Sequence, residues 1–296
     1  MNWVLDKIRF MRTYPKVGGY AEYNSHISAM PAHVEEAGFK EIHGHKYQTV
    51  FYKPYKGKYE GSGLRLSFGS NGSGTYIAID CTPYKLTDDE WFDVRGYLTV
   101  IFGGPEVLAK EFRLFEVELA ADIPYPIDDL VYVVPKLTIE NPLALLKKHQ
   151  HEIGSKQGNR WVRIYDKQKQ LKEVKKLKVA HPLTRIEFVH RKLAITLNKL
   201  LSLPNPFGGI LAIKRQDIRE LQKQYPTDYV FAHFAKLIAN GATGQAAYLN
   251  MADADMRKAI RKRLQSRALN LAGKKSDWDA WIAGELGSLK SKFALE

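Results

Sequence analysis

Hydrophobic and polar positions in the first two thirds of the chain often follow the two-residue period of a β-strand. The clearest case is FRLFEVELAADI at 112–123, where Val117 and Leu119 alternate with Glu116 and Glu118. Such alternation puts apolar side chains on one face of a strand and the acids on the other. Runs of β-branched and aromatic residues bounded by turn residues predict further strands. They lie at 47–55, 63–68, 74–81, 98–103, 158–167 and 183–191.

Helical signals lie between and after these strands. Thr87 followed by Glu90 is the pattern of a capping box and predicts a helix over 87–98. Asn141 with Pro142 at the next position predicts the start of a short helix over 141–153. The basic run at 168–179 is expected to form a hairpin or a helix. Further helices are expected at 192–203, 215–225, 228–241 and 253–273.

The chain changes character after PNPFGG at 204–209, where strand patterns give way to helical ones. We therefore expect an α+β domain over 1–204, followed by an α-helical C-terminal domain over 205–296 that binds DNA or has an accessory role. The 296 residues and 45% hydrophobic content are sufficient for ordinary cores.

Composition excludes several classes of protein. No apolar run approaches the roughly 20 residues that span a bilayer, and MNWVLDKIRF lacks the apolar stretch of a secretory signal. The single cysteine, Cys81, can form neither an internal disulfide nor a cysteine-rich metal site. A cytoplasmic protein that does not act at a membrane is expected.

Positive charge is concentrated in one part of the chain. The formal net charge is +13, and residues 145–200 hold 15 Lys and Arg against 4 Asp and Glu, a net +11. Clustered positive charge favours a polyanionic partner, either nucleic acid or an anionic membrane surface.

The stretch GNRWVRIYDKQKQ at 158–170 places a tyrosine among these cations. On a regular strand Trp161, Arg163, Tyr165 and Lys167 share one face, because side chains alternate. A tyrosine hydroxyl between two cations suits a phosphate group. Tyrosine has an ordinary pKa near 10, and neighbouring cations favour its phenolate form.

Two acids occupy similar positions in alternating strands, Glu118 in V-E-L and Glu187 in I-E-F. Strands paired side by side would bring these carboxylates together as a site for Mg²⁺ or Mn²⁺. Such an ion would polarise a phosphate that Tyr165 attacks. His190 is an odd number of residues from Glu187, so a regular strand puts it on the opposite face, and it reaches the site only across a bulge or strand end.

GSKQGNRWVRIYDK at 154–167, preceded by FEVELAADI at 115–123 and followed by LTRIEFVHR at 183–191, resembles the Rep-trans-type family. These are the replication initiators and relaxases of rolling-circle plasmids and some filamentous phages. The resemblance covers about residues 112–191. The family's upstream strand usually reads Arg-x-Asp, whereas this chain has Glu116-Val117-Glu118, so the upstream ligand is open between Glu116, Glu118 and Asp122.

The resemblance implies a relaxase-like antiparallel sheet, a divalent metal and origin-specific nicking and joining of one DNA strand through a 5′-phosphotyrosine at Tyr165. Arg163 and Lys167 would assist the nucleophile. The covalent link conserves bond energy, so strands can be rejoined without ATP. The expected DNA is an origin, extruded as a hairpin or single-stranded at the nick site. A host helicase is a partner by family resemblance alone, and a homodimer is left open.

Cations and one aromatic residue are expected to hold the DNA through phosphates and stacking. Near Tyr165 and the following strand they are Lys156, Arg160, Trp161, Arg185 and Arg191. In the C-terminal helix they are Lys258, Arg261 and Lys262, which lie opposite an apolar stripe.

Three other functions remain open. A non-enzymatic protein that binds single-stranded nucleic acid would use the same basic and aromatic residues, and a conjugative relaxase would share the chemistry. A basic membrane-surface protein is more distant, because no helix combines a strong apolar face with aromatic anchors. His43 and His45 have metal-ligand spacing around a glycine, and Tyr20, Tyr23 and Tyr225 are candidate second nucleophiles.

Overall fold

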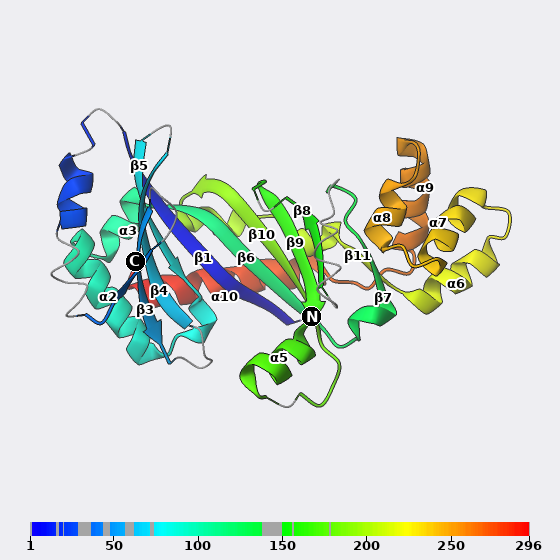
Figure 1. The fold of residues 1–296 in the computed structure, drawn as a ribbon, viewed down its shortest axis with the longest axis horizontal. Coiled ribbons are helices and arrows are strands. Elements are labelled where there is room, and N and C mark those ends of the chain that lie inside the picture. Colours follow the sequence, from blue (N-terminus) through cyan, green and yellow to red (C-terminus); the bar gives the residue numbers. More distant parts are fainter. Residues whose placement is uncertain are drawn as a thin grey trace. The chain divides into compact units, whose positions relative to one another are not determined.

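A computed structural model describes residues 2–15, 18–19, 21–28, 37–43, 48–56, 62–71, 74–137, 150–155, 157–177 and 179–295. Its main feature is a large antiparallel sheet with helices, so the expected α+β class is confirmed (Figure 1). Among the described residues the sheet has nine strands in the order β2-β3-β4-β5-β1-β6-β10-β9-β8, and a second sheet pairs β11 with β7.

The strands of the large sheet come from both halves of the chain. They are β1 (Asn2–Pro15), β2 (Lys40–His43), β3 (Gln48–Tyr55), β4 (Ser62–Asn71), β5 (Gly74–Cys81), β6 (Arg113–Ile123), β8 (Gln150–Gly154), β9 (Arg160–Asp166) and β10 (Thr184–Ile195). Contacts divide the chain into two compact units. Unit 1 comprises Met1–Trp3, Ala120–Val189 and Pro204–Trp278; unit 2 comprises Val4–Leu119, His190–Leu203 and Asp279–Glu296. The predicted division after residue 204 stays a prediction.

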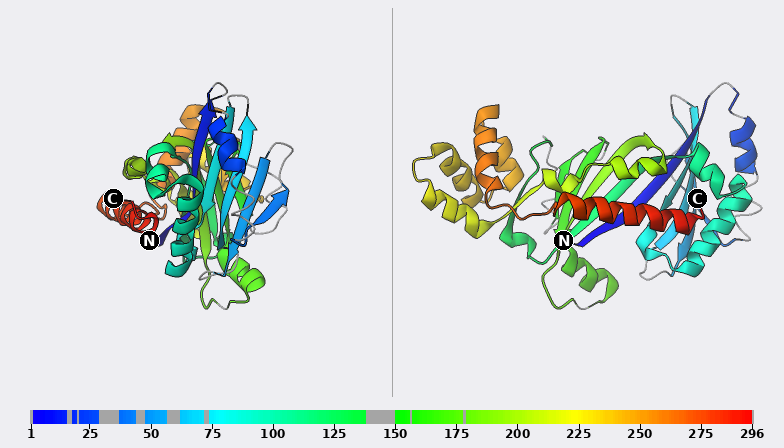
Figure 2. Two further views of the ribbon diagram at one scale, coloured as in Figure 1. Left: turned by 90° about the vertical axis from the view of Figure 1, so that its left-hand side faces the viewer. Right: turned by 180° about the vertical axis from the view of Figure 1, so that it is seen from behind.

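Unit 2 contains a run of antiparallel strands with helices on one face. These helices are α2 (Asp88–Phe102), α3 (Pro105–Glu111) and most of α10 (Lys275–Phe293). Phe293 of α10 contacts Phe10 and Trp91 edge-to-face, with ring centroids 5.6 and 4.9 Å apart, and Figure 2 shows α10 and α2 on the same side of the strands. The expected capping box of Thr87 and Glu90 is present.

Unit 1 contains a separate small core. It is built from β7 (Leu130–Val133) and β11 (Leu211–Lys214), covered by α6 (Arg215–Gln224), α7 (Tyr229–Ala239), α8 (Gly244–Leu249) and α9 (Ala254–Gln265). Figure 1 shows the four helices gathered beside this strand pair. Buried Gln245 ties α8 to the strand end, accepting from Val134 N at 2.8 Å and donating to Leu137 O at 2.6 Å. Gly244 packs so closely that a Cβ would lie 2.4 Å from Val131 Cγ1.

Several expected elements are wrong in type. Residues 98–103, expected as a strand, complete α2, because Trp91, Val94, Leu98 and Ile101 are buried at helical spacing. Gly103 ends the helix at φ +86°.

Four further expectations can be compared with the structure. Instead of a helix over 192–203, β10 continues to Ile195 and a 3₁₀ helix, η3 (Leu197–Ser202), follows. Residues 150–153, expected to end a helix, lie in β8, and 141–149 lie outside the described residues. The basic run after Tyr165 forms the helix α5 (Lys167–Lys175), and the last long basic helix ends at Gln265, not at residue 273.

Candidate active site

Strand β9 places the candidate nucleophile as its alternation predicts. Val162 and Ile164 are fully buried on one face, and Arg163 and Tyr165 are half-buried on the other. β8 pairs antiparallel with β9, which sets Gln150 opposite Tyr165 and Glu152 opposite Arg163. Lys167 departs from the predicted strand face, because it is the first residue of α5, which Asp166 caps by accepting from Lys169 N at 2.8 Å.

Tyr165 contacts an acid of β10. Its hydroxyl donates a hydrogen bond to Glu187 Oε1 at 2.6 Å, and Arg163 Nη2 lies 2.5 Å from Glu187 Oε2. Glu187 is 2% exposed, so this carboxylate is held away from bulk water between a phenol and a guanidinium. A carboxylate in this position can accept the phenolic proton when the oxygen acts as a nucleophile.

Two cations lie beside the contact of Tyr165 with Glu187. Lys167 Nζ lies 5.7 Å from the centre of the Tyr165 ring and donates to Gln170 Oε1 at 2.7 Å. Arg163 lies over Trp161, with its guanidinium carbon 4.9 Å from the ring centre. Trp161 is 6% exposed, so it packs under the arginine and does not present a face to solvent.

Three acids form a group that could hold a metal ion. Asp6, Glu118 and Glu187 each offer one carboxylate oxygen, and the three oxygens lie within 4.8 Å of one another. They come from β1, β6 and β10, which are neighbours in the sheet order. Three carboxylates are a donor set that suits Mg²⁺ or Mn²⁺. The expected pair of Glu118 and Glu187 is thus brought together, and Asp6 joins it.

Asp122 and Arg185, which were expected to bind metal and DNA, form a bidentate pair with each other. Arg185 Nε lies 2.7 Å from Asp122 Oδ1, and Arg185 Nη2 lies 2.7 Å from Asp122 Oδ2. Arg185 is 5% exposed. Asp122 does not belong to the group of Asp6, Glu118 and Glu187, and this pair gives both side chains a structural role, so we leave them out of the proposed site.

Glu116 and Arg191 belong to a second cluster, within unit 2. Glu116 contacts Lys7 at 3.2 Å, Arg191 Nε at 2.7 Å and Arg9 Nη1 at 3.8 Å. Burial disfavours the charged carboxylate, but the three cations outweigh it and hold the pKa of Glu116 below its ordinary value. Its neighbours are therefore cations, and it is not a member of the acidic group.

The depressed pKa predicts a pH dependence of stability. A carboxyl whose pKa is lowered by folding stabilises the protein above its unfolded pKa, and this contribution is lost as pH falls through the folded value. We expect Glu116→Gln to lower the free energy of unfolding by about 1–3 kcal/mol at pH 7, with the difference from the parent shrinking below about pH 4. Urea titrations from pH 3 to 7 measure this. The exposed Glu41→Gln is the control, and a Glu116→Gln deficit that is constant over this range would contradict the assignment.

None of the other predicted residues that the structure describes belongs to this acidic group. His190 is buried, and the alternation of β10 puts it on the opposite face from Glu187. Arg160, Lys258, Arg261 and Lys262 are exposed cations, the last three on α9. Lys156, His45 and Tyr20 lie outside the described residues, as does the side chain of His43. Tyr23 is buried and donates to Gly69 O, and Tyr225 lies under Arg263 at 3.7 Å.

Sequence reasoning missed two acids. Asp6 lies in β1, where the alternation of buried residues shifts between Leu5 and Ile8, so no single two-residue period runs through the whole strand. Glu152 is 5% exposed and lies opposite Arg163, but its segment was expected to be helical. The signal that could have found β1 is its regular alternation on either side of Asp6 and Lys7.

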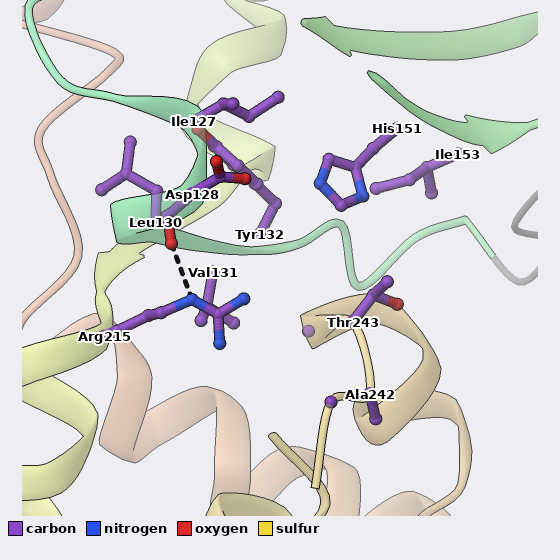
Figure 3. A pocket seen from close by; sticks show the side chains of 12 residues that line it. Ile127, Asp128, Leu130, Val131, Tyr132, His151, Ile153, Arg215, Ala242 and Thr243 are labelled. Atoms are coloured by element: carbon purple, nitrogen blue, oxygen red, sulfur yellow. Dashed lines mark hydrogen bonds between the residues drawn. The ribbon is translucent and has the colours of Figure 1, made fainter. Parts of the chain in front are cut away.

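Unit 1 also contains a small cavity of about 180 Å³, lined by residues that include Asp128, His151, Arg215 and Thr243. Figure 3 shows Arg215 at its edge, where Nε donates to Asp128 O at 2.8 Å. None of the predicted site residues lines this cavity.

The sequence matches no protein-family model and no curated protein. Within the part of the chain that the structure describes, no helix is both long and apolar enough to cross a membrane.

Proposed function

We propose that the protein is a metal-dependent DNA nicking–joining enzyme of the rolling-circle initiator type, with Tyr165 as its nucleophile. The observation that supports this most is the contact of the Tyr165 hydroxyl with Glu187 Oε1 at 2.6 Å, in a group that also contains Arg163. A tyrosine beside a buried carboxylate and a cation has what a phosphoryl-transfer nucleophile needs: a proton acceptor and a positive charge.

These contacts support the following reaction. Glu187 accepts the phenolic proton as Tyr165 Oη attacks the phosphorus of a DNA phosphodiester. The new bond is a 5′-phosphotyrosine, and the 3′ oxygen leaves and takes up a proton as a hydroxyl. Arg163 balances negative charge beside Glu187, and Lys167 lies near the ring. Attack by a 3′ hydroxyl on the phosphotyrosine reverses these steps and joins strands.

A divalent metal ion bound by Asp6, Glu118 and Glu187 would stabilise the charge that develops on the phosphate oxygens. The exposed cations Arg160, Lys258, Arg261 and Lys262 would hold DNA through phosphates, consistent with the net charge of +13. Cleavage at a conjugative transfer origin would use the same chemistry, so the natural DNA decides between initiator and relaxase.

The deciding experiment is incubation of the protein with a supercoiled plasmid that carries its own replication origin, with Mn²⁺ or Mg²⁺. We expect open-circular plasmid and an SDS-stable protein–DNA adduct, which peptide mapping assigns to Tyr165. Chelation of the metal by EDTA should abolish both products. If the protein binds the origin but forms no nick or adduct with either metal, the non-enzymatic binding function replaces this proposal.

A further inference from the structure

Two tyrosine rings in unit 2 lie against glycines of β4. A Cβ built on Gly63 would lie 2.3 Å from Tyr52 Cε2, and one built on Gly69 would lie 2.6 Å from Tyr76 Oη. A side chain at either glycine would have to displace the ring, so each ring covers its glycine. Both tyrosines are half-buried, which leaves part of each ring accessible.

Cations share this face of the sheet. Gly63, Arg65 and Gly69 are separated by even numbers of residues in β4, so they face the same way. Arg65 lies opposite Tyr52 of β3 and Asp80 of β5, and Lys40 of β2 lies opposite Tyr52. Arg65 and Lys40 are exposed. We call Lys40, Tyr52, Arg65 and Tyr76 the tyrosine face.

The described charges on this face favour an anion. Asp80 is the acidic residue on this face among the paired residues of strands β1 to β5. It is 4% exposed. It lies 2.6 Å from Arg9 and 3.2 Å from Lys7. Glu116 shares these two cations, and Arg191 adds a third, so the cluster has more cations than acids. Solvent therefore meets Lys40 and Arg65 beside two aromatic rings.

We infer that the tyrosine face binds single-stranded DNA, in addition to and resting on the proposed nicking function. Unpaired bases stack on aromatic rings without regard to sequence, and cations beside the rings bind the backbone phosphates. Gly63 and Gly69 are six residues apart, which separates the two rings by about 20 Å along β4. A strand lying along β4 would stack one base on each ring, with Arg65 on its phosphates between them.

A purely structural role for the rings makes a different prediction. An aromatic ring over a strand glycine protects the backbone and stabilises the sheet. In that case replacing a ring would lower stability, and DNA affinity would be unchanged wherever the variant is folded. Binding and thermal unfolding are therefore measured on the same samples.

The first test uses the full chain, a fluorescein-labelled twelve-nucleotide oligothymidine and EDTA, with affinity read from anisotropy. Tyr52→Leu and Tyr76→Leu should each weaken binding at least about fivefold, whereas Tyr52→Phe and Tyr76→Phe should bind within about twofold of the parent. Tyr229→Leu, at an 83% exposed tyrosine on α7, is the matched control. Gly63→Ala should also weaken binding, since it displaces an intact ring.

Salt dependence and crosslinking complete the test. Arg65→Gln should reduce the slope of log affinity against log salt by about 0.7, and the exposed Arg113→Gln should not. A 5-iodouracil oligonucleotide should crosslink to peptides containing Tyr52 and Tyr76. The inference would be overturned if both folded leucine variants bound with the affinity of the parent. It would also be overturned if crosslinks formed only on other peptides, or if an RNA of equal sequence bound more tightly.

The outcomes separate this inference from the proposed function. Tyr165→Phe should bind the oligothymidine like the parent, because Tyr165 is not part of the tyrosine face. If the parent nicks no origin and the leucine variants lose binding, the nicking proposal is refuted. The tyrosine face then remains as a binding surface for single-stranded DNA. If the parent nicks its origin and the leucine variants bind the oligothymidine normally, only the proposed role of the tyrosine face is refuted.

Discussion

Replacing Tyr165 by phenylalanine is expected to reduce origin nicking by roughly 10³-fold or more and to eliminate the covalent protein–DNA adduct. The substitution removes the attacking oxygen and keeps the ring beside which Lys167 lies. Glu187 retains its contact with Arg163, so the carboxylate keeps a charged partner. The loss of this hydrogen bond to a buried carboxylate should lower stability by about 1–3 kcal/mol.

Gel electrophoresis of supercoiled plasmid measures the nicking, and an SDS-stable radiolabelled band measures the adduct. Tyr229→Phe is the matched control and should nick like the parent, since that tyrosine is exposed on α7. Origin affinity without metal should be the same in all three proteins. Normal nicking by Tyr165→Phe, or an adduct on Tyr225, would show that another group is the nucleophile.

Elements with an unbroken local pattern were predicted from the sequence. Strand β6 alternates from Phe115 to Leu119, and the capping box at Thr87 is a purely local signal, so both are found where expected. The C-terminal part of α2 shows the limit. Val100, Ile101 and Phe102 favour a strand by propensity, but burial of Leu98 and Ile101 on the face begun by Trp91 outweighs this preference.

Only the part of the candidate site that lies within a single strand was predicted from the sequence. The shared face of Arg163 and Tyr165 follows from alternation within β9, whereas the contact of Tyr165 with Glu187 depends on how strands are placed in the sheet. Asp6 was missed because the alternation of β1 shifts beside it. The pairing of Asp122 with Arg185 joins residues 63 positions apart, and no local pattern could indicate it.

Breaking the buried pair of Asp122 and Arg185 is the second change for which we expect a large effect. Arg185→Ala should lower the free energy of unfolding by about 3–5 kcal/mol, because it leaves the Asp122 carboxylate without its guanidinium in a site from which water is largely excluded. The Asp122 side chain is 11% exposed and that of Arg185 is 6% exposed. Asp122→Ala should have an effect of similar size, since it leaves the buried Arg185 guanidinium without its carboxylate.

The double variant Asp122→Leu with Arg185→Leu separates structure from function. Removing both charges removes the desolvation penalty along with the attraction, so we expect the double variant to recover most of the lost stability. Urea unfolding of the parent, the two single variants and the double variant measures the coupling. If the pair is structural, the double variant should also nick with the metal dependence of the parent. Single variants that lose less than about 1 kcal/mol would refute the buried pair, and a stable double variant that no longer responds to metal would return Asp122 to the set of metal ligands.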